Sequence, residues 1–165
     1  GSPYASFTFQ VQDDGGTASG GVNLDQSPNT VTISVTPVND APGFTKGADQ
    51  NVSEDSGART AANWATGITR GGGADEAGQT VAFTVSNNNN ALFSVQPAVA
   101  ANGTLTFTPA SNAFGSATVS VQITDNGGTA NGGVNASAPQ TFTINVAPVN
   151  DRPTFTAGGN VSSPE

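Results

Sequence analysis

The side chains of this sequence that could do chemistry are almost all oxygen donors. Its 165 residues include 12 acidic and 4 basic side chains, with neither cysteine nor histidine. That composition leaves no thiol or imidazole nucleophile, no disulfide, and none of the usual zinc or copper ligands. Carboxylate and amide oxygens are the ligands that Ca²⁺ prefers. The composition therefore favours calcium as a cofactor, and the net charge of −8 argues against nucleic acid or an anionic membrane as a partner.

The acidic residues lie in segments that occur twice. The segment PVNDAP at 37–42 returns as PVNDRP at 148–153, and the Asp-x-Gly-Gly-Thr pattern that begins at Asp13 returns at Asp125. Asn39 and Asn150 are 111 positions apart, which is the size of one β-sandwich domain rather than of a solenoid unit. We therefore expect the C-terminal hairpin of one repeat at 1–38, a complete repeat at 39–152 and the start of a third at 153–165.

The complete repeat has the pattern of an all-β chain. Short alternating apolar segments are separated by turn residues, and only 35% of the residues are hydrophobic, which suits a thin core between two sheets. The sequence contains no run of 18 apolar residues, which is about the length that a membrane-spanning helix requires. We predict a seven-stranded Greek-key β-sandwich. The expected strands are 44–52, 59–66, 80–86, 91–95, 104–108, 117–124 and 141–146, with a glycine-rich loop at 71–78.

The first 38 residues repeat the last two strands of this domain. Phe7, Phe9 and Val11 stand where Val119, Val121 and Ile123 stand later. Val31, Ile33 and Val35 likewise correspond to Phe142, Ile144 and Val146. The apolar phase is the same in both copies, so this segment is predicted to be a hairpin. Residues 154–162 are predicted to be the first strand of a following repeat.

The order of these motifs resembles that of the cadherin repeat. The matching pieces are Val52-Ser53-Glu54, Asp75-Glu76, Leu92 to Val95, Ile123 to Gly128, and Val38 to Pro42. The sequence is most similar to the bacterial cadherin-like and Ig-like tandem repeats of large surface adhesins, the extender repeats of RTX-type adhesins. The resemblance covers nearly the whole repeat and implies a cadherin-like sandwich.

The resemblance also implies where calcium would bind. In a sandwich of that topology, the inter-domain linker and two loops meet at the N-terminal pole of the domain. They would bring together Asn39, Asp40, Asp75, Glu76 and Asp125. At the opposite pole Glu54, Asn150 and Asp151, with Asp55 as a further candidate, would form half of the next junction.

The linker departs from the cadherin pattern in two ways. Pro37 and Pro148 stand where the family has its first aspartate, and Ala41 and Arg152 stand where it has a second asparagine. We therefore expect fewer ions at each junction than in animal cadherins.

Other interpretations of the same residues remain open. Aspartates in loops are commonly turn formers, which is the expected role of Asp13, Asp14 and Asp25. Trp64 is expected in the core, although an exposed tryptophan could stack on a sugar. Lys46, the sole lysine, could in principle form an isopeptide bond, but no motif marks one.

Three classes of function follow from these interpretations. The favoured one is a calcium-stiffened extender repeat of a bacterial cell-surface or secreted adhesin, with neighbouring repeats as its partners. The alternative is a polysaccharide-binding module of a secreted adhesin or carbohydrate-active protein. An enzyme is disfavoured because the acidic pair Asp75–Glu76 lies in a loop with no implied cleft. The predicted location is extracellular, and the apolar hairpin also suggests self-association.

Overall fold

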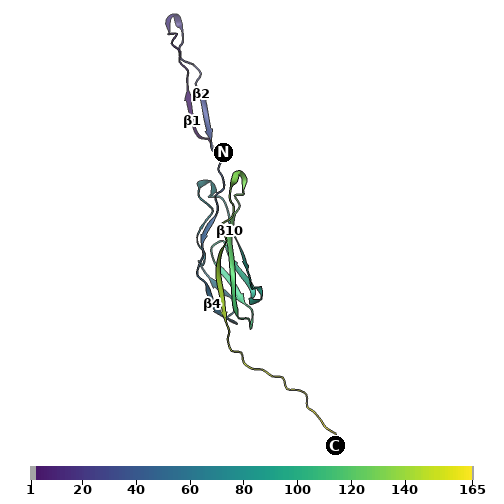
Figure 1. Ribbon diagram of the computed structural model, residues 1–165. Helices are drawn as coiled ribbons and strands as arrows, with labels where there is room; N and C mark the ends of the chain where they lie inside the picture. The colour runs from purple at the N-terminus through teal and green to yellow at the C-terminus, as the bar shows by residue number, and fades with distance from the viewer. Residues whose placement is uncertain (1–2, 165) are drawn as a thin grey trace. The chain divides into compact units, whose positions relative to one another are not determined.

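The computed structural model describes residues 3–164, which belong to two compact units. The first unit runs to Val38 and takes in residues 130–132; the second begins at Asn39 and contains the remainder. Each unit is described by itself below, and Figure 1 traces both along the chain.

The first unit is a two-stranded antiparallel hairpin. β1 (Pro3–Phe9) pairs with β2 (Asn29–Ser34), with Phe7 opposite Val31 and Ala5 opposite Ile33. The long connection contains one short 3-10 turn, η1 (Ala18–Gly20). Gly15 N donates to Asp13 Oδ1 at 3.0 Å and Ser27 N to Asp25 Oδ1 at 2.9 Å. Both aspartates therefore act as the turn formers that the sequence predicted.

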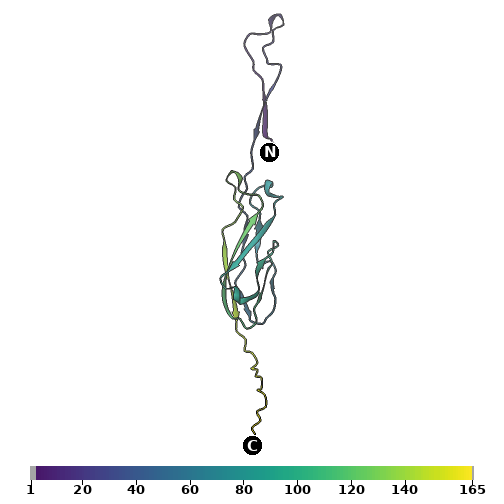
Figure 2. The same ribbon diagram turned by 90° about the vertical axis from the view of Figure 1, so that its right-hand side faces the viewer.

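The second unit contains a four-stranded sheet in the order β4-β11-β10-β7. Its strands are β4 (Gln50–Ser53), β7 (Val81–Asn87), β10 (Gly115–Asp125) and β11 (Gln140–Ala147). β10 pairs antiparallel with both of its neighbours, whereas β4 pairs with β11 in parallel. Figures 1 and 2 show β10 running the length of this sheet.

The facing layer is built from two smaller sheets. One has the order β5-β9-β8, formed by β5 (Arg59–Ala61), β9 (Leu105–Pro109) and β8 (Phe93–Val99). The other pairs β3 (Gly43–Thr45) with β6 (Thr66–Thr69). The predicted all-β sandwich of the cadherin-like and Ig-like type is confirmed, and the expected glycine-rich loop carries a single 3-10 turn, η2 (Ala74–Glu76).

The core lies between these layers and is made by the predicted alternation. Val119, Val121 and Ile123 of β10 are fully buried, as are Ile144 of β11 and Leu105 of β9. Aromatic side chains pack against one another in this core. Phe44 meets Phe83 edge-on with ring centroids 5.1 Å apart, and Trp64 lies 4.4 Å from Phe142.

Two of the predicted strands are divided in the structure. The expected strand 44–52 breaks into β3 and β4, which join different sheets, and the chain crosses between them at Gly47. A Cβ at Gly47 would overlap Trp64, so only a glycine allows the backbone to pass this close to the indole. The expected strand 59–66 divides into β5 and β6 around Asn63, whose φ is +53°.

The segment that follows β11 forms no strand within the described part of the chain. Residues 148–164 lack regular structure, and the side chains from Val149 to Pro164 are exposed. The expected strand at 154–162 is therefore not formed here, because no neighbouring strand pairs with it. No helix of the described residues is long and apolar enough to cross a membrane.

Candidate cation site

The first group of predicted ligands meets where the chain enters the second unit. Asn39 Nδ2 donates to Asp125 Oδ1 at 3.0 Å and to the carbonyl oxygen of Val134 at 2.7 Å. Gln79 Nε2 donates to Asn39 Oδ1 at 2.7 Å. Residues 86 positions apart in sequence are thus joined at the end of β10, as the resemblance implied.

Asp40 and Glu76 form the second contact of this pole. The backbone N–H of Asp40 donates to Glu76 Oε1 at 2.5 Å, and the N–H of Gln79 donates to the Glu76 carbonyl oxygen at 3.0 Å. Glu76 lies on η2 and is only 2% exposed, while the side chain of Asp40 is exposed. The glycine-rich loop therefore folds inward to bury one of its two adjacent acids.

Three buried oxygens at this pole lack a hydrogen-bond partner: Glu76 Oε2, Asp125 Oδ2 and Gln79 Oε1. Burying a carboxylate costs free energy unless the charge is paired or coordinated. All the donors recorded for Glu76 and Asp125 are amide N–H groups, of Asp40 for the first and of Asn39 and Gly127 for the second. A cation that takes oxygen ligands would satisfy these orphaned atoms, so the residues present fit Ca²⁺.

Two glycines make room for this arrangement. Gly71 has φ +126°, and a Cβ there would overlap Glu76 Oε2 and lie 2.7 Å from the Asp40 carbonyl oxygen. A Cβ at Gly127 would overlap the side-chain amide of Asn39. The backbone approaches the buried polar groups so closely at both points that no side chain can be accommodated without a shift.

Asp75 does not join the buried group. Its side chain is exposed, and its Oδ1 lies against Gly73 of the same loop. Among the residues that the structure describes, no three acidic side chains lie close enough together to hold a metal ion. A cation bound here would therefore need amide, carbonyl or water oxygens beside the carboxylates of Glu76 and Asp125.

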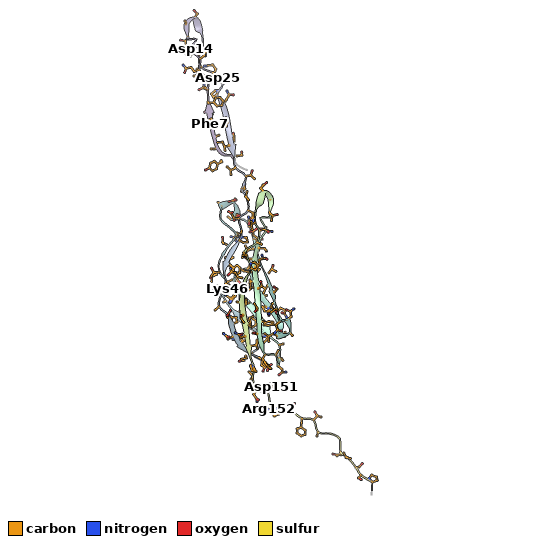
Figure 3. The ribbon with its side chains drawn as sticks, in the orientation of Figure 1. Phe7, Asp14, Asp25, Lys46, Asp151 and Arg152 are labelled. Carbon is orange, nitrogen blue, oxygen red and sulfur yellow. The ribbon has the colours of Figure 1, made fainter. Side chains whose placement is uncertain are left out.

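The second group of predicted ligands lies where the chain leaves the sandwich. Glu54 is 4% exposed; its Oε1 accepts the N–H of Val149 at 2.7 Å, and its Oε2 has no partner. Asp55 Oδ1 accepts a long 3.4 Å bond from Asn112 N. Asn150 and Asp151 are exposed and bond only locally, Asn150 Nδ2 donating to the Asp151 carbonyl oxygen at 3.3 Å. Figure 3 shows Asp151 beyond the sandwich.

The two groups occupy opposite ends of one domain. Asp125 is the last residue of β10. Glu54 lies near the other end of that strand. It follows β4, where Val52 is opposite Val146 of β11, and Val146 is opposite Gly115 at the start of β10. The 11 residues of β10 span about 33 Å at the usual rise of a strand. Each end thus carries its own buried carboxylate with an orphaned oxygen.

Several residues of the first group carry no charge and were not predicted from the sequence. Gln79 bridges Glu76 and Asn39, and Asn126 Oδ1 accepts the N–H of Thr80 at 2.8 Å. The only sequence signal was their position, directly after the acidic loop and directly after Asp125. Gly71 was predicted as a loop residue, but its contact with Glu76 follows from the fold alone.

The structure places Trp64 in the core and Lys46 at the surface. Trp64 is buried, and its Nε1 donates to the carbonyl oxygen of Ala48 at 2.9 Å, so it serves the core and not a sugar platform. Lys46 is exposed on the sandwich, as Figure 3 shows.

The all-β sandwich defines an Ig-like module. A sequence model of the bacterial Ig domain matches residues 39–145. The chain belongs to this family, and the match begins at the first residue of the second compact unit.

The chain is also similar to solved structures, of which one is described here. It is the S-layer protein SbsC, domains 4 and 5, with 17% sequence identity and a TM-score of 0.33. The alignment covers 74% of this chain and 59% of that one, so the chain spans less than two thirds of the matched structure. No curated protein matches the sequence.

Proposed function

We propose that this chain is a calcium-binding structural extender of a bacterial surface or secreted adhesin, located outside the cell. The observation that supports it best is the presence of buried, unpartnered carboxylate oxygens at both ends of the sandwich: Glu76 and Asp125 at one end and Glu54 at the other. Membership of the bacterial Ig domain family and the 111-residue repeat agree with a role as one link in an array.

Bound calcium would supply positive charge that the folded chain does not place beside these acids. Glu76 and Asp125 would hold it with Gln79, and the linker would join through Asn39 or the exposed carboxylate of Asp40. Because Asn39 and Asp40 belong to the linker and the other groups to the domain, ligation would fix the linker torsions. Pro37 and Pro42 already limit those torsions.

The repeat predicts how one link would continue into the next. Glu54 contacts Val149, which belongs to the second copy of the Pro-Val-Asn-Asp motif. Asn150 and Asp151 would therefore occupy, before a following repeat, the linker positions that Asn39 and Asp40 occupy before this one. Each junction would combine Glu54-type residues of one repeat with Glu76-type and Asp125-type residues of the next.

A calcium titration of thermal stability tests the proposal. A ligand that binds only the folded state adds about 2.7 kcal/mol at a hundredfold excess over its Kd, which raises Tm by roughly 10 °C in a domain of this size. The variant Glu76→Gln should lose at least half of this rise, whereas Asp14→Asn, which removes an exposed acid from the first unit, should keep it. Identical melting curves in calcium and in excess chelator would contradict the proposal.

The extender role makes a separate prediction about rigidity. Small-angle scattering should give a narrower distribution of end-to-end distances in calcium than in chelator, because ligation fixes the linker. Glu76→Gln should show the broad distribution under both conditions. Calcium binding without any narrowing would support a cation site but contradict the extender role.

A further inference from the structure

The outer face of the four-stranded sheet carries an open groove over β7 and β10. It has a volume of about 410 Å³, within the usual range for small-ligand sites, and is lined by Ser86, Asn87, Asn88, Thr118 and Ser120. Thr118 and Ser120 alternate with two fully buried valines of β10, so both hydroxyls lie on the face away from the core. Ser86 of β7 is directly opposite Ser120. Every side chain that lines the groove is therefore an uncharged hydroxyl or amide.

The amide side chains of this groove are held by hydrogen bonds within the protein. Asn88 Oδ1 accepts the N–H of Thr118 at 2.9 Å, and Asn87 Oδ1 accepts the N–H of Asn89 at 2.9 Å. Asn87 Nδ2 donates to Gln96 Oε1 of β8 at 2.9 Å, which joins the groove to the facing layer. Both amides thus have a fixed orientation before any ligand binds, which lowers the entropy cost of binding.

The strands that form the groove carry almost no charge. Between Ala77 and Ala147 the sequence has no lysine or arginine, and Asp125 is its one acid. Asp125 is buried seven residues beyond Thr118 on β10, or about 23 Å at the usual rise of a strand. Asp49, on the far side of β11, accepts the N–H of Thr143 at 2.8 Å and adds only negative charge to this sheet. A phosphate, sulfate or carboxylate ligand would find no cation on these strands.

The composition of the groove also differs from that of a protein interface. The buried centres of such interfaces are rich in aromatic, methionine and arginine side chains and poor in serine. Hydroxyl and amide groups both donate and accept hydrogen bonds, and so do the hydroxyl groups of a sugar. A neutral saccharide is therefore the ligand class that this lining matches best.

An exposed aromatic ring lies at the same end of β10. Phe114 directly precedes this strand and is 64% exposed, whereas most aromatic rings of the second unit belong to the core. Asn89 Nδ2 donates to the carbonyl oxygen of Ser116 at 3.2 Å, so the segment that follows Asn88 reaches the residues next to Phe114. An aromatic ring offers a flat apolar surface on which the C–H groups of a sugar ring can pack.

We propose that this groove binds a neutral saccharide. The hydroxyls of Ser86, Thr118 and Ser120 and the amide of Asn88 supply the hydrogen bonds, and a ligand of more than one sugar unit extends to Phe114. The groove shares no residue with either group of predicted cation ligands, so the two sites can be tested separately.

Affinity electrophoresis of the full chain tests the ligand class, because a protein with a pI of about 4.1 migrates readily in a native gel. The gels contain dextran, laminarin or galactomannan as neutral polymers, and polygalacturonate as the acidic counterpart. At least one neutral polymer should retard the chain, and polygalacturonate should not. Unchanged mobility in all three neutral gels, or equal or stronger retardation by polygalacturonate, overturns the proposal.

Variants of the groove test the site. Ser86→Ala combined with Thr118→Val removes two hydroxyls with little change in shape, and should weaken binding of the retarding polymer about tenfold. Thr106→Val is the matched control, because Thr106 is exposed on β9 in the facing layer, and it should bind as the parent does. Thermal unfolding verifies that both variants are folded. Equal binding by the double variant and the parent overturns the assignment of the groove.

Phe114→Ala tests the aromatic contact separately. The variant should bind the same polymer severalfold more weakly than the parent, because the ring no longer packs on the sugar. Its exposed position means that the folded sandwich should be retained. Unchanged affinity would overturn the contact with Phe114.

Discussion

Glu76 is a buried acidic residue whose burial costs free energy. It is buried beside Asp40, one of its carboxylate oxygens has no partner, and the adjacent Asp75 is left in solvent. A carboxylate kept in such a place lowers stability unless something neutralises it. Gly71 allows the placement, because its positive φ and missing side chain leave space for Glu76 Oε2.

The variant Gly71→Ala is expected to destabilise the second unit by about 1–3 kcal/mol, through backbone strain at positive φ and displacement of Glu76. It should also weaken calcium binding. Gly78→Ala is the matched control in the same loop, because its added Cβ meets no atom within 4 Å. Urea unfolding of both variants measures the difference. Equal stabilities would show that the loop can relax and that Gly71 is dispensable.

At the residue scale, the sequence predicted contacts that follow from the order of the strands, but not the placement of individual side chains within a loop. The convergence of Asn39 with Asp125 followed from the strand order that the resemblance implied. The sequence could not predict which of Asp75 and Glu76 would be buried, because adjacent acids in a loop have the same local pattern. That choice depends on side-chain length and on the space beside Gly71, which exist only in the folded chain.

At the scale of elements, the alternation of apolar and polar residues predicted most of the strands. β7, β9, β10 and β11 follow the predicted segments closely, because every second side chain over at least five residues is half-buried in β7 and largely buried in the other three strands. The two divided strands escaped prediction because their breaks are caused by distant contacts. Gly47 passes over Trp64, which is 17 positions away, and no local pattern records that contact.

The facing layer is expected to depend on its few buried side chains. Leu105→Ala on β9 should cost about 2–5 kcal/mol, because Leu105 is fully buried between the sheets. Val95→Ala on the neighbouring β8 removes a side chain that is more than half exposed and should change stability by less than about 0.5 kcal/mol. Thermal unfolding of the two variants compares them directly. A small loss for Leu105→Ala would mean that the core collapses around the cavity.

At the scale of the whole molecule, the two units differ in how much core they have. The second unit encloses a continuous core, whereas the first has two strands and side chains that remain largely exposed. An isolated hairpin is marginal in water, and regions with few buried contacts open with little free energy. The repeat provides a matched comparison, since the same sequence pattern occurs in both units.

Hydrogen exchange at low protein concentration should separate these copies. Amides of β1 and β2 should exchange orders of magnitude faster than their counterparts in β10 and β11, because the hairpin buries much less apolar surface than the sandwich does. Mass spectrometry of peptides around Phe7 and Val119 makes the comparison. Equal protection in dilute monomer would show that the hairpin has a stabilising contact of its own.

The parallel pairing of β4 with β11 has a consequence for a chain under tension. β4, the second strand of the domain, and β11, its last strand, lie side by side and point the same way, so the backbone enters at one end of the sandwich and leaves at the other. A pull applied through Asn39 and Ala147 would slide these strands along each other and load their hydrogen bonds together. Peeling would break those bonds one at a time and at lower force. A domain loaded in this way would therefore resist at the boundary between β4 and β11, rather than at either end of the sandwich.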